Sequence, residues 1–370
     1  MTSVSVLHLI DSLAVGGAER VAVNLVNALP RDPYRLYLGT TRAEGLLASQ
    51  IAAGVGRLRL ARHGRFDAGA LRQLLTMLRA ERIQIIHAHS TSVVLAAVAA
   101  LFVPRLRLIW HIHYGRLAQG NPPFIYRLLA RRLNGVITVS MDLKNWVQRD
   151  LHLPSQSVWY IPNFVTPSPP AHMAVDLPGT PATRLICVGN VRYEKDPETL
   201  VRAMALVVPH FPTAHLLFVG RYTNSPCVAE VRRLLTAHQL TAHVTFLGEQ
   251  TDVPAILHSA AVGVLSSRSE GLPMTLLEYG AAALPVVATT VGQCAEVLDG
   301  GAAGLLVPPQ RPDLLAAALL TLLADPARRA TLGRCLQARV QVRYSSAAVI
   351  GQVDQVYRTL LGHTAEEDAQ

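Results

Sequence analysis

The sequence predicts an α/β protein with two domains, each built on a parallel sheet wrapped by helices. The chain has 370 residues, half of them apolar, which is long for one hydrophobic core and comfortable for two. Short apolar runs alternate with helical patterns in both halves, as expected for parallel sheets with crossover helices. Between the halves lies Thr166–Thr183, TPSPPAHMAVDLPGTPAT, whose prolines suit neither element and indicate an interdomain linker.

The apolar runs give five expected strands in each half. In the first half they are Val4–Ile10, Arg35–Gly39, Gln84–His87, Arg107–His111 and Gly135–Val139. In the second half they are Arg184–Val188, His215–Val219, His243–Leu247, Val262–Leu265 and Pro285–Ala288. Open parallel sheets bind ligands beyond the carboxyl ends of their strands. We therefore look for functional residues in the loops that follow these runs.

The first such loop contains Gly16 and Gly17. It precedes an expected helix, Ala18–Leu29, with an apolar stripe at Val21 and Leu25. Two glycines allow a ligand, such as a donor phosphate, to approach the backbone closely. A plain tight turn is the alternative.

The loop after the expected strand Arg184–Val188 contains Arg192 and Lys195. Of the 34 basic residues only Lys144 and Lys195 are lysines, so this position departs from the arginine usage of the chain. Two cations here would neutralise a diphosphate leaving group, each charged hydrogen bond contributing about 1.5–3 kcal/mol. The alternative is a solvated pair of surface cations.

The segment Ser269–Gly280, SEGLPMTLLEYG, is the most informative in the chain. In this segment Glu270 precedes a turn that contains Gly271 and Pro273. A helix is expected to follow, since its first turn tolerates proline, and Glu278 lies in that helix. The first amides of that helix, over Gly271, Leu272, Pro273, Met274 and Thr275, would favour an anion such as a diphosphate. Glu270 would then accept sugar hydroxyls or stabilise developing positive charge, and Glu278 would reach ribose hydroxyls. Helix capping and a surface acid are the alternatives.

This stretch resembles the E-x7-E motif of retaining glycosyltransferases of family 4, which have the GT-B fold. Further segments agree with that resemblance in the family's order. They are VGGAERVAVNLVNAL from Val15, IIHAHS from Ile85, HIHYG from His111, GVITVS from Gly135, YIPNFV from Tyr160, VGNVRYEKDPETLVRA from Val188, VTFLGEQTDVPAIL from Val244 and GLLVPP from Gly304. The resemblance spans nearly the whole chain. One departure is Asn190, which stands where the family commonly has arginine after the glycine, so we expect Arg192 to supply the guanidinium.

The resemblance implies two facing Rossmann-like domains, at 1–166 for the acceptor and at 183–345 for the nucleotide-sugar donor. It also implies a last helix, 346–362, that returns to pack on the first domain. The expected activity is a metal-independent, retaining transfer of a hexose from a nucleotide diphosphate, UDP or GDP, without a cofactor. His113, at the end of a strand, is implied to contact the donor sugar, although His111 lies only two residues away and a core histidine is the alternative.

Charge is unevenly distributed. Residues 1–175 hold 19 Lys+Arg against 8 Asp+Glu, and residues 176–370 hold 15 against 17, so net charges of about +11 and −2 make up the total of +9. The basic first half predicts an anionic partner. In FIYRLLARRL, Phe124, Ile125, Leu128, Leu129 and Leu133 would line one helical side flanked by Arg127, Arg131 and Arg132. That pattern favours an anionic lipid surface, a core-facing helix with a solvated basic face being the alternative. No motif for nucleic-acid binding accompanies the arginines.

The longest apolar run, Val93–Val103, is shorter than the roughly 20 residues that span a bilayer, and the start of the chain lacks a signal pattern. Four scattered cysteines without metal-like spacing suggest buried thiols and predict no structural metal. We expect a cytoplasmic protein that can lie on the inner face of a membrane. A lipid-linked or anionic glycan acceptor, as in capsule or exopolysaccharide assembly, fits the basic first half.

Three other functions are weighed. A nucleotide-sugar epimerase or a phosphorylase could use a similar scaffold, and product analysis would separate both from a transferase. A degenerate scaffold protein that only binds nucleotide is disfavoured by Lys195, Glu270 and Glu278. A dehydrogenase is disfavoured because the first loop, DSLAVGGAER, lacks the G-x-G-x-x-G pattern.

Overall fold

The computed structural model describes residues 3–64, 67–115, 117, 124–166, 176–223, 225–250 and 252–362. The chain divides into two compact units. The first unit comprises Met1–Phe164 with Ser346–Gln370, and the second unit comprises Val165–Ser345. Residues 167–175 of the predicted linker lie outside the described residues.

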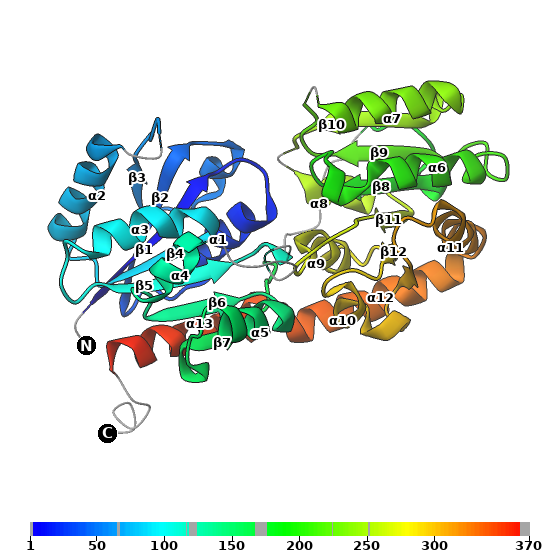
Figure 1. Cartoon of the computed structure of the whole chain (residues 1–370). Helices are drawn as coiled ribbons and strands as arrows, with labels where there is room; N and C mark the ends of the chain where they lie inside the picture. The colour runs from blue at the N-terminus through cyan, green and yellow to red at the C-terminus, as the bar shows by residue number, and fades with distance from the viewer. Residues whose placement is uncertain are drawn as a thin grey trace. The chain divides into compact units, whose positions relative to one another are not determined.

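The first unit contains a seven-stranded sheet in which every pair of neighbours is parallel (Figure 1). In spatial order its strands are β3 (Gly56–Arg59), β2 (Tyr34–Ala43), β1 (Val4–Ser12), β4 (Ile85–His89), β5 (Arg107–Ile112), β6 (Gly135–Thr138) and β7 (Val158–Tyr160). Its helices are α1 (Gly17–Ala28), α2 (Ala68–Ala80), α3 (Val93–Ala100), α4 (Phe124–Ala130), α5 (Met141–Asp150) and α13 (Ser346–Leu361).

The second unit contains a six-stranded sheet, also parallel throughout. In spatial order its strands are β10 (Val244–Gly248), β9 (His215–Val219), β8 (Arg184–Val188), β11 (Val262–Leu265), β12 (Val286–Thr289) and β13 (Leu305–Val307). Its helices are α6 (Pro197–Val207), α7 (Pro226–Ala237), α8 (Val253–His258), α9 (Met274–Ala281), α10 (Cys294–Val297), α11 (Pro312–Ala324) and α12 (Pro326–Arg343).

Burial explains why these segments form strands. The inner strands β4 and β6 are buried along their whole length, as parallel strands covered on both faces must be. In the second unit, Leu200 of α6, Leu216 of β9 and Leu319 of α11 belong to one buried cluster. Burying a leucine side chain contributes about 1.5–3 kcal/mol, so the helices are held to the sheet mainly by apolar contact.

The last helix, α13, belongs to the first unit, as predicted. The phenol of Tyr34 in β2 donates a 2.5 Å hydrogen bond to Asp354 of α13, and Tyr357 is fully buried against β4. The predicted fold class, with two Rossmann-like parallel sheets and a returning helix, is therefore confirmed. The ten predicted strands are present with limits shifted by a few residues at most, and β3, β7 and β13 were not predicted.

Two surface features differ from expectation. Leu129 in α4 is buried while Phe124, Ile125 and Leu128 are exposed, so the predicted apolar side of this helix is split between core and solvent. The four cysteines are free, but only Cys187 and Cys294 are buried as predicted, whereas Cys227 is partly buried and Cys335 is exposed. None of the helices in the described residues combines the length and the apolar character needed to cross a membrane.

Candidate active site

Charged side chains gather in the two loops that follow β8 and β11 of the second unit. These two strands are hydrogen-bonded neighbours, so the loops at their carboxyl ends emerge side by side. The ammonium of Lys195 donates to the carboxylate of Glu270 at 2.6 Å, and their side chains are only 16 % and 10 % exposed. The hydroxyl of Ser267 donates to the same carboxylate oxygen at 2.6 Å. Two residues predicted separately from the sequence thus form one ion pair.

Hydrogen bonds between the loops hold this pair in place. The hydroxyl of Ser266 reaches the carbonyl oxygens of Lys195 and Asp196 at 3.0 and 3.1 Å. The amide of Arg268 donates to the carbonyl of Glu194 at 2.8 Å. Each loop therefore fixes the backbone of the other, which is the rigidity that a preorganised charged site needs.

A second ion pair lies beside the first and was not predicted. The guanidinium of Arg268 donates to the fully buried carboxylate of Asp196 at 2.8 Å and stacks over the ring of Tyr193 at 4.4 Å. Asp196 also accepts from the amide of Thr199 and so caps helix α6. By contrast, the predicted cation Arg192 is half exposed and lies 3.8 Å from Glu194.

Helix α9 begins at Met274 with Pro273 as its N-terminal cap residue. The prediction placed Pro273 inside the first turn, so the helix starts one residue later than expected. A proline ring cannot accept a hydrogen bond, and no side chain of the cap satisfies the first-turn amides. The positive end of the helix dipole therefore lies beside Gly271 and the Lys195–Glu270 pair, in a setting that suits an anion.

Tyr279 anchors α9 to strands β8 and β11. Its buried phenol accepts from the amide of Val188 at 3.0 Å and lies 3.1 Å from the carbonyl of Ile186. A Cβ atom at Gly263 would lie 2.7 Å from the Tyr279 ring, so only glycine admits this side chain. The hydroxyl of Thr275 donates to the carbonyl of Val188, which ties the first turn to the end of β8. Glu278, one turn further along α9, is partly exposed.

A third loop, after β12, closes around the backbone of Glu270. Gly292 has a φ of +52°, and a Cβ atom there would lie 2.4 Å from the carbonyl oxygen of Glu270. The amide of Gln293 donates to the carbonyl of Gly271 at 2.9 Å. Sequence reasoning missed this contact, although the glycine in TTVGQC was a usable signal for a close backbone approach.

Two buried cysteines border this site. Burial raises the pKa of the Cys187 thiol to about 12 and also raises the pKa of Cys294 strongly. Both remain protonated at neutral pH and are unsuited to act as nucleophiles. The ionisable chemistry of this edge therefore belongs to its lysine, arginines and carboxylates.

In the first unit, the predicted glycine loop follows β1. Gly16 is the cap residue of α1 in an extended conformation, and a Cβ atom on it would lie 2.3 Å from the carboxylate of Glu19. The atom approached is the flexible end of the Glu19 side chain, so this contact does not by itself require glycine at position 16. Gly17 begins the helix.

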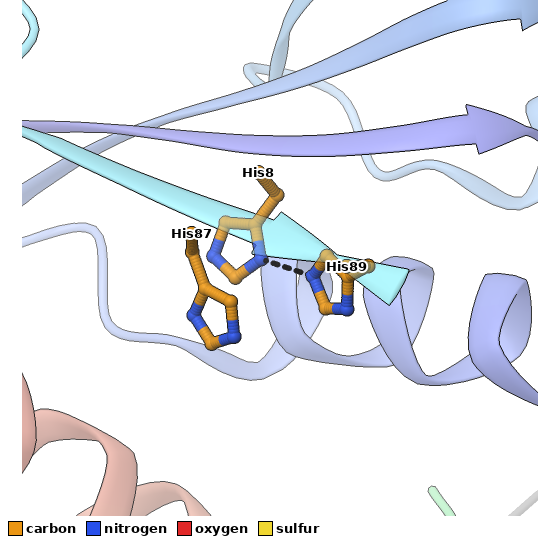
Figure 2. Close-up of side chains that lie close together, drawn as sticks. All are labelled: His8, His87 and His89. Carbon is orange, nitrogen blue, oxygen red and sulfur yellow. Dashed lines mark hydrogen bonds between the residues drawn. The ribbon is translucent and has the colours of Figure 1, made fainter. Parts of the chain in front are cut away.

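His113 follows β5 and belongs to a cluster of imidazoles on one face of the first sheet. The histidine cluster comprises His8 of β1, His87 and His89 of β4, His111 of β5, and His113. Figure 2 shows three of these rings, with the hydrogen bond between His8 and His89 drawn. His8 pairs with His87 and His89 pairs with His111 in the strand registers, so the rings stand side by side. Only His113 and His111 were considered from the sequence.

Burial keeps the cluster neutral. It lowers the pKa of His8 and of His113 to about 3, and the pKa values of His87, His89 and His111 also fall far below the usual range. The cluster contains two groups of three histidines in which one nitrogen of each ring lies within 4.8 Å of the others. One group is His8, His87 and His89, and the other is His89, His111 and His113. Neutral imidazoles at that spacing could hold a transition metal.

The alternation in IIHAHS and HIHYG was the overlooked signal for this cluster. Side chains at positions i and i+2 of a strand share a face, so both histidine pairs had to point the same way. What the sequence could not give was the order of the strands. The adjacency of β1, β4 and β5 is what joins five distant residues into one group.

Comparison with known proteins identifies both halves. Residues 15–168 match the model of "Glycosyltransferase Family 4", and residues 182–325 match the model of "Glycosyl transferases group 1". A glycogen synthase of Mycobacterium tuberculosis strain H37Rv is 26 % identical over 345 residues, covering 90 % of this chain and 79 % of that protein. The lipopolysaccharide core biosynthesis mannosyltransferase LpcC of Rhizobium leguminosarum is 27 % identical over 299 residues, covering 79 % and 83 %.

Solved structures share the fold. Anabaena HepE in complex with UDP-glucose superposes with a TM-score of 0.80 at 20 % identity, covering 96 % of this chain and 99 % of that one. A sucrose-phosphate synthase from Thermosynechococcus elongatus superposes with a TM-score of 0.78 at 22 % identity, covering 97 % and 100 %. These structures and the two parallel sheets show the GT-B fold. The two family matches, which together span most of the sequence, show that the chain belongs to the glycosyltransferases of family 4.

Proposed function

We propose that this chain is a metal-independent, retaining hexosyltransferase that moves a sugar from a nucleotide diphosphate to an acceptor hydroxyl. The observation that carries the proposal is the Lys195–Glu270 pair, at 2.6 Å, beside the first turn of α9. It combines a cation and a helix terminus suited to a diphosphate with a carboxylate suited to a sugar.

Lys195 would bind the diphosphate without leaving Glu270. An ammonium has three donors, and the hydrogen bond to Glu270 uses one of them. As the bond from sugar to diphosphate breaks, negative charge grows on the leaving group. Lys195 and the backbone N–H groups of Gly271, Leu272, Met274 and Thr275 would stabilise that charge. Arg192 is half exposed and is the proposed second cation.

Two carboxylates and one histidine would handle the sugar and the nucleotide. Glu270, fixed by Lys195 and Ser267, would accept sugar hydroxyls and stabilise positive charge that develops at the reacting carbon. Glu278 would reach the ribose hydroxyls. His113 would orient the donor sugar, and Gly16 and Gly17 would allow close approach of the donor phosphate or the acceptor to the backbone.

The donor is proposed to be a UDP- or GDP-sugar, with no further cofactor. HepE was solved with UDP-glucose, and LpcC is a mannosyltransferase, which supports a hexose. Screening UDP-, GDP- and ADP-sugars for a rise in Tm would identify the nucleotide, because a ligand at 100 times its Kd stabilises the folded state by about 2.7 kcal/mol. Lack of stabilisation by all three would contradict the proposal.

Analysis of the products separates transfer from its alternatives. A sugar joined to an acceptor with the donor's anomeric configuration supports retaining transfer. An isomerised nucleotide sugar would indicate an epimerase, and a sugar phosphate formed with inorganic phosphate would indicate a phosphorylase. Binding of nucleotide without turnover would indicate a scaffold protein.

The acceptor is proposed to be a lipid-linked or anionic glycan in the assembly of cell-surface polysaccharide. The first unit, proposed as the acceptor domain, carries most of the positive charge of the chain. On α4, Phe124 is 80 % exposed, Ile125 and Leu128 are also exposed, and Arg127 lies within the same turn. Apolar side chains beside arginines suit the interface of an anionic membrane, so we propose peripheral association at the cytoplasmic face.

Vesicle sedimentation tests this membrane surface. Reversing the charges at Arg127, Arg131 and Arg132 to glutamate should reduce binding to anionic vesicles strongly, since each basic residue near the surface contributes about 1 kcal/mol. The matched control reverses Arg328, Arg334 and Arg343 of α12 in the second unit, which should leave binding unchanged. Equal partitioning of both triple variants would contradict the membrane proposal.

A further inference from the structure

The basic side chains at the carboxyl edge of the second sheet are paired with acids, with one exception. Five basic residues lie in the described loops that follow its strands: Arg192 and Lys195 after β8, Arg221 after β9, Arg268 after β11 and Arg311 after β13. Four of them have a carboxylate oxygen within 3.8 Å of a basic nitrogen. Arg221 is exposed and has no ion pair with any residue that the structure describes.

This pairing limits what the edge can offer to a diphosphate. An ion pair carries no net charge, whereas a diphosphate carries several negative charges. The side chains of Lys195 and Arg268 are only 16 % and 20 % exposed, and each is in contact with its acid. These pairs supply hydrogen-bond donors but little excess positive charge. A cation without an acid of its own is therefore the group that would complete a site for a polyanion.

Hydrogen bonds fix the backbone of Arg221 to the loop that carries Lys195. Strands β8 and β9 are parallel neighbours, so these loops leave the sheet side by side. The amide of Arg221 donates to the side-chain oxygen of Asn190 at 3.0 Å. The carbonyl of Arg221 accepts from the amide of Val191 at 2.9 Å. Arg221 is therefore tied on both sides of its peptide to residues that lie shortly before Lys195.

Two glycines bring the two loops into direct contact. Gly189 and Gly220 follow β8 and β9 with φ values of +149° and +144°. A Cβ atom at Gly220 would lie 2.4 Å from the carbonyl oxygen of Gly189, and one at Gly189 would lie 3.4 Å from Cε of Lys195. One glycine thus separates the backbone next to Arg221 from the side chain of Lys195. The long arginine side chain can reach a ligand held by Lys195 across this short distance.

We propose that Arg221 is a further cation of the diphosphate site, with Asn190 as its positioning residue. Asn190 stands where the family commonly has arginine, and its side chain holds Arg221 on the neighbouring loop. The guanidinium is therefore supplied from β9 instead of from β8. Arg192 contributes less, because Glu194 lies 3.8 Å from its guanidinium. The inference rests on the proposed function, since it assumes that a nucleotide diphosphate binds at this edge.

Glu249 offers a different role for Arg221. One carboxylate oxygen of Glu249 is buried and finds no hydrogen-bond partner among the described residues. Glu249 follows β10, which borders β9 on the side away from β8. If Arg221 served only to balance this acid, Arg221→Ala would lower the Tm, Glu249→Gln would restore it, and nucleotide affinity would not change. Our proposal predicts the opposite, a loss of affinity with little change in Tm.

Calorimetric titration of the full chain with UDP, GDP, UMP and GMP tests the proposal. Arg221→Ala should weaken the preferred diphosphate by about tenfold to 150-fold, the value of one charged hydrogen bond. It should weaken the matching monophosphate less, because a monophosphate presents less charge to neutralise. The matched control is Arg232→Ala, which removes an exposed arginine from α7 of the same unit and should change neither affinity.

Moving the guanidinium back tests the role given to Asn190. Asn190→Arg in the Arg221→Ala background should recover most of the lost affinity, since it places a guanidinium on the loop of Lys195. Asn190→Ala alone should cause a smaller loss than Arg221→Ala, because it frees the backbone of Arg221 but keeps the cation. Absence of recovery in the double variant would contradict the replacement of one arginine by the other.

Comparison with Lys195→Ala separates failure of this inference from failure of the proposed function. Normal diphosphate affinity of Arg221→Ala, together with a loss in Lys195→Ala, would overturn the inference and leave the proposed function standing. A larger loss in Arg192→Ala than in Arg221→Ala would also overturn it. No binding of either diphosphate by the wild-type chain would contradict the proposed function and this inference together.

Discussion

The two units build the carboxyl edges of similar parallel sheets from opposite kinds of polar side chain. In the first unit the edge and the strands that lead to it carry neutral imidazoles, linked to one another and to Tyr357. In the second unit the edge carries ion pairs, with Lys195 bound to Glu270 and Arg268 bound to Asp196. Both sheets are parallel throughout, so the contrast lies in the side chains that each sheet places at its carboxyl edge.

The contrast follows from the cost of burying charge. A buried charge must be paired, and the second unit meets this requirement with interlocked loops that keep opposite charges within 2.8 Å. Such a site can receive a diphosphate with little rearrangement. The histidine cluster of the first unit avoids charge, because burial keeps its imidazoles neutral. A neutral edge suits hydroxyl groups, and a charged edge suits a phosphorylated ligand.

Removing the Lys195 ammonium from the carboxyl edge of the second unit should have the largest effect on sugar transfer. Lys195→Ala is expected to reduce transfer by about 10²- to 10³-fold, the loss typical of one preorganised group that stabilises developing negative charge. It should also abolish the rise in Tm caused by the nucleotide sugar. Steady-state kinetics and thermal shift measure both effects.

The chain offers a matched control for this variant in its other lysine. Lys144→Ala alters α5 of the first unit and should leave transfer within twofold of wild type. If Lys195→Ala remained folded and kept full activity, the charged edge would not be the site of the diphosphate, and the comparison between the two edges would lose its functional meaning.

Shifting the backbone that carries Glu270 should have a smaller effect. At Gly292, with φ of +52°, the Cβ atom of Gly292→Ala would lie 2.4 Å from the Glu270 carbonyl oxygen, so the loop must move. We expect a loss of about tenfold to 100-fold in kcat, since small misplacements of catalytic groups are costly. Gly300→Ala is the control, because Gly300 also has a positive φ, of +64°, with open space around it. Equal activity of the two variants would show that the position of Glu270 is not critical.

Acid should destabilise the first unit before the second. Burial lowers the folded-state pKa of His8 from 6.5 to about 3, so below pH 6.5 the unfolded chain binds a proton that the folded chain does not. Stability contributed by this neutral histidine is full above pH 6.5 and falls by about 1.4 kcal/mol per pH unit as the pH decreases toward 3. The buried histidines of the described residues all belong to the first unit. They are His8, His87, His89 and His111.

Tryptophan fluorescence can follow this loss in one unit alone. The three tryptophans of the chain, Trp110, Trp146 and Trp159, all belong to the first unit. Urea unfolding monitored by their emission should shift to lower urea as the pH falls from 7 to 5. The transition followed by circular dichroism should separate into two steps. A midpoint that is independent of pH in this range would contradict neutral burial of the cluster.

The sequence predicted the fold well because parallel strands buried on both faces appear as continuous apolar runs. The three strands that were missed, β3, β7 and β13, all lie at an edge of a sheet. The strand β3 reads GRLR and the other two have only three residues each. Edge strands face solvent on one side and need fewer apolar residues, so their pattern is weak.

The candidate site was predicted residue by residue but not as a set of contacts. Lys195 and Glu270 were each chosen for their chemistry, yet their direct ion pair depends on the adjacency of β8 and β11. Arg268 was missed because its partner, Asp196, is distant in sequence. The histidine cluster was missed for the same reason, since strand order is a property of the fold and not of any local motif.

The central claim is that the charged edge of the second unit binds an activated sugar through its diphosphate. A crystal structure of the complex with a non-hydrolysable UDP- or GDP-sugar tests it most directly. We predict phosphate oxygens within hydrogen-bond distance of the Lys195 ammonium and of one or more backbone N–H groups of Gly271, Leu272, Met274 and Thr275, with the sugar against Glu270. A nucleotide bound elsewhere, with the Lys195–Glu270 pair out of contact with it, would contradict the account.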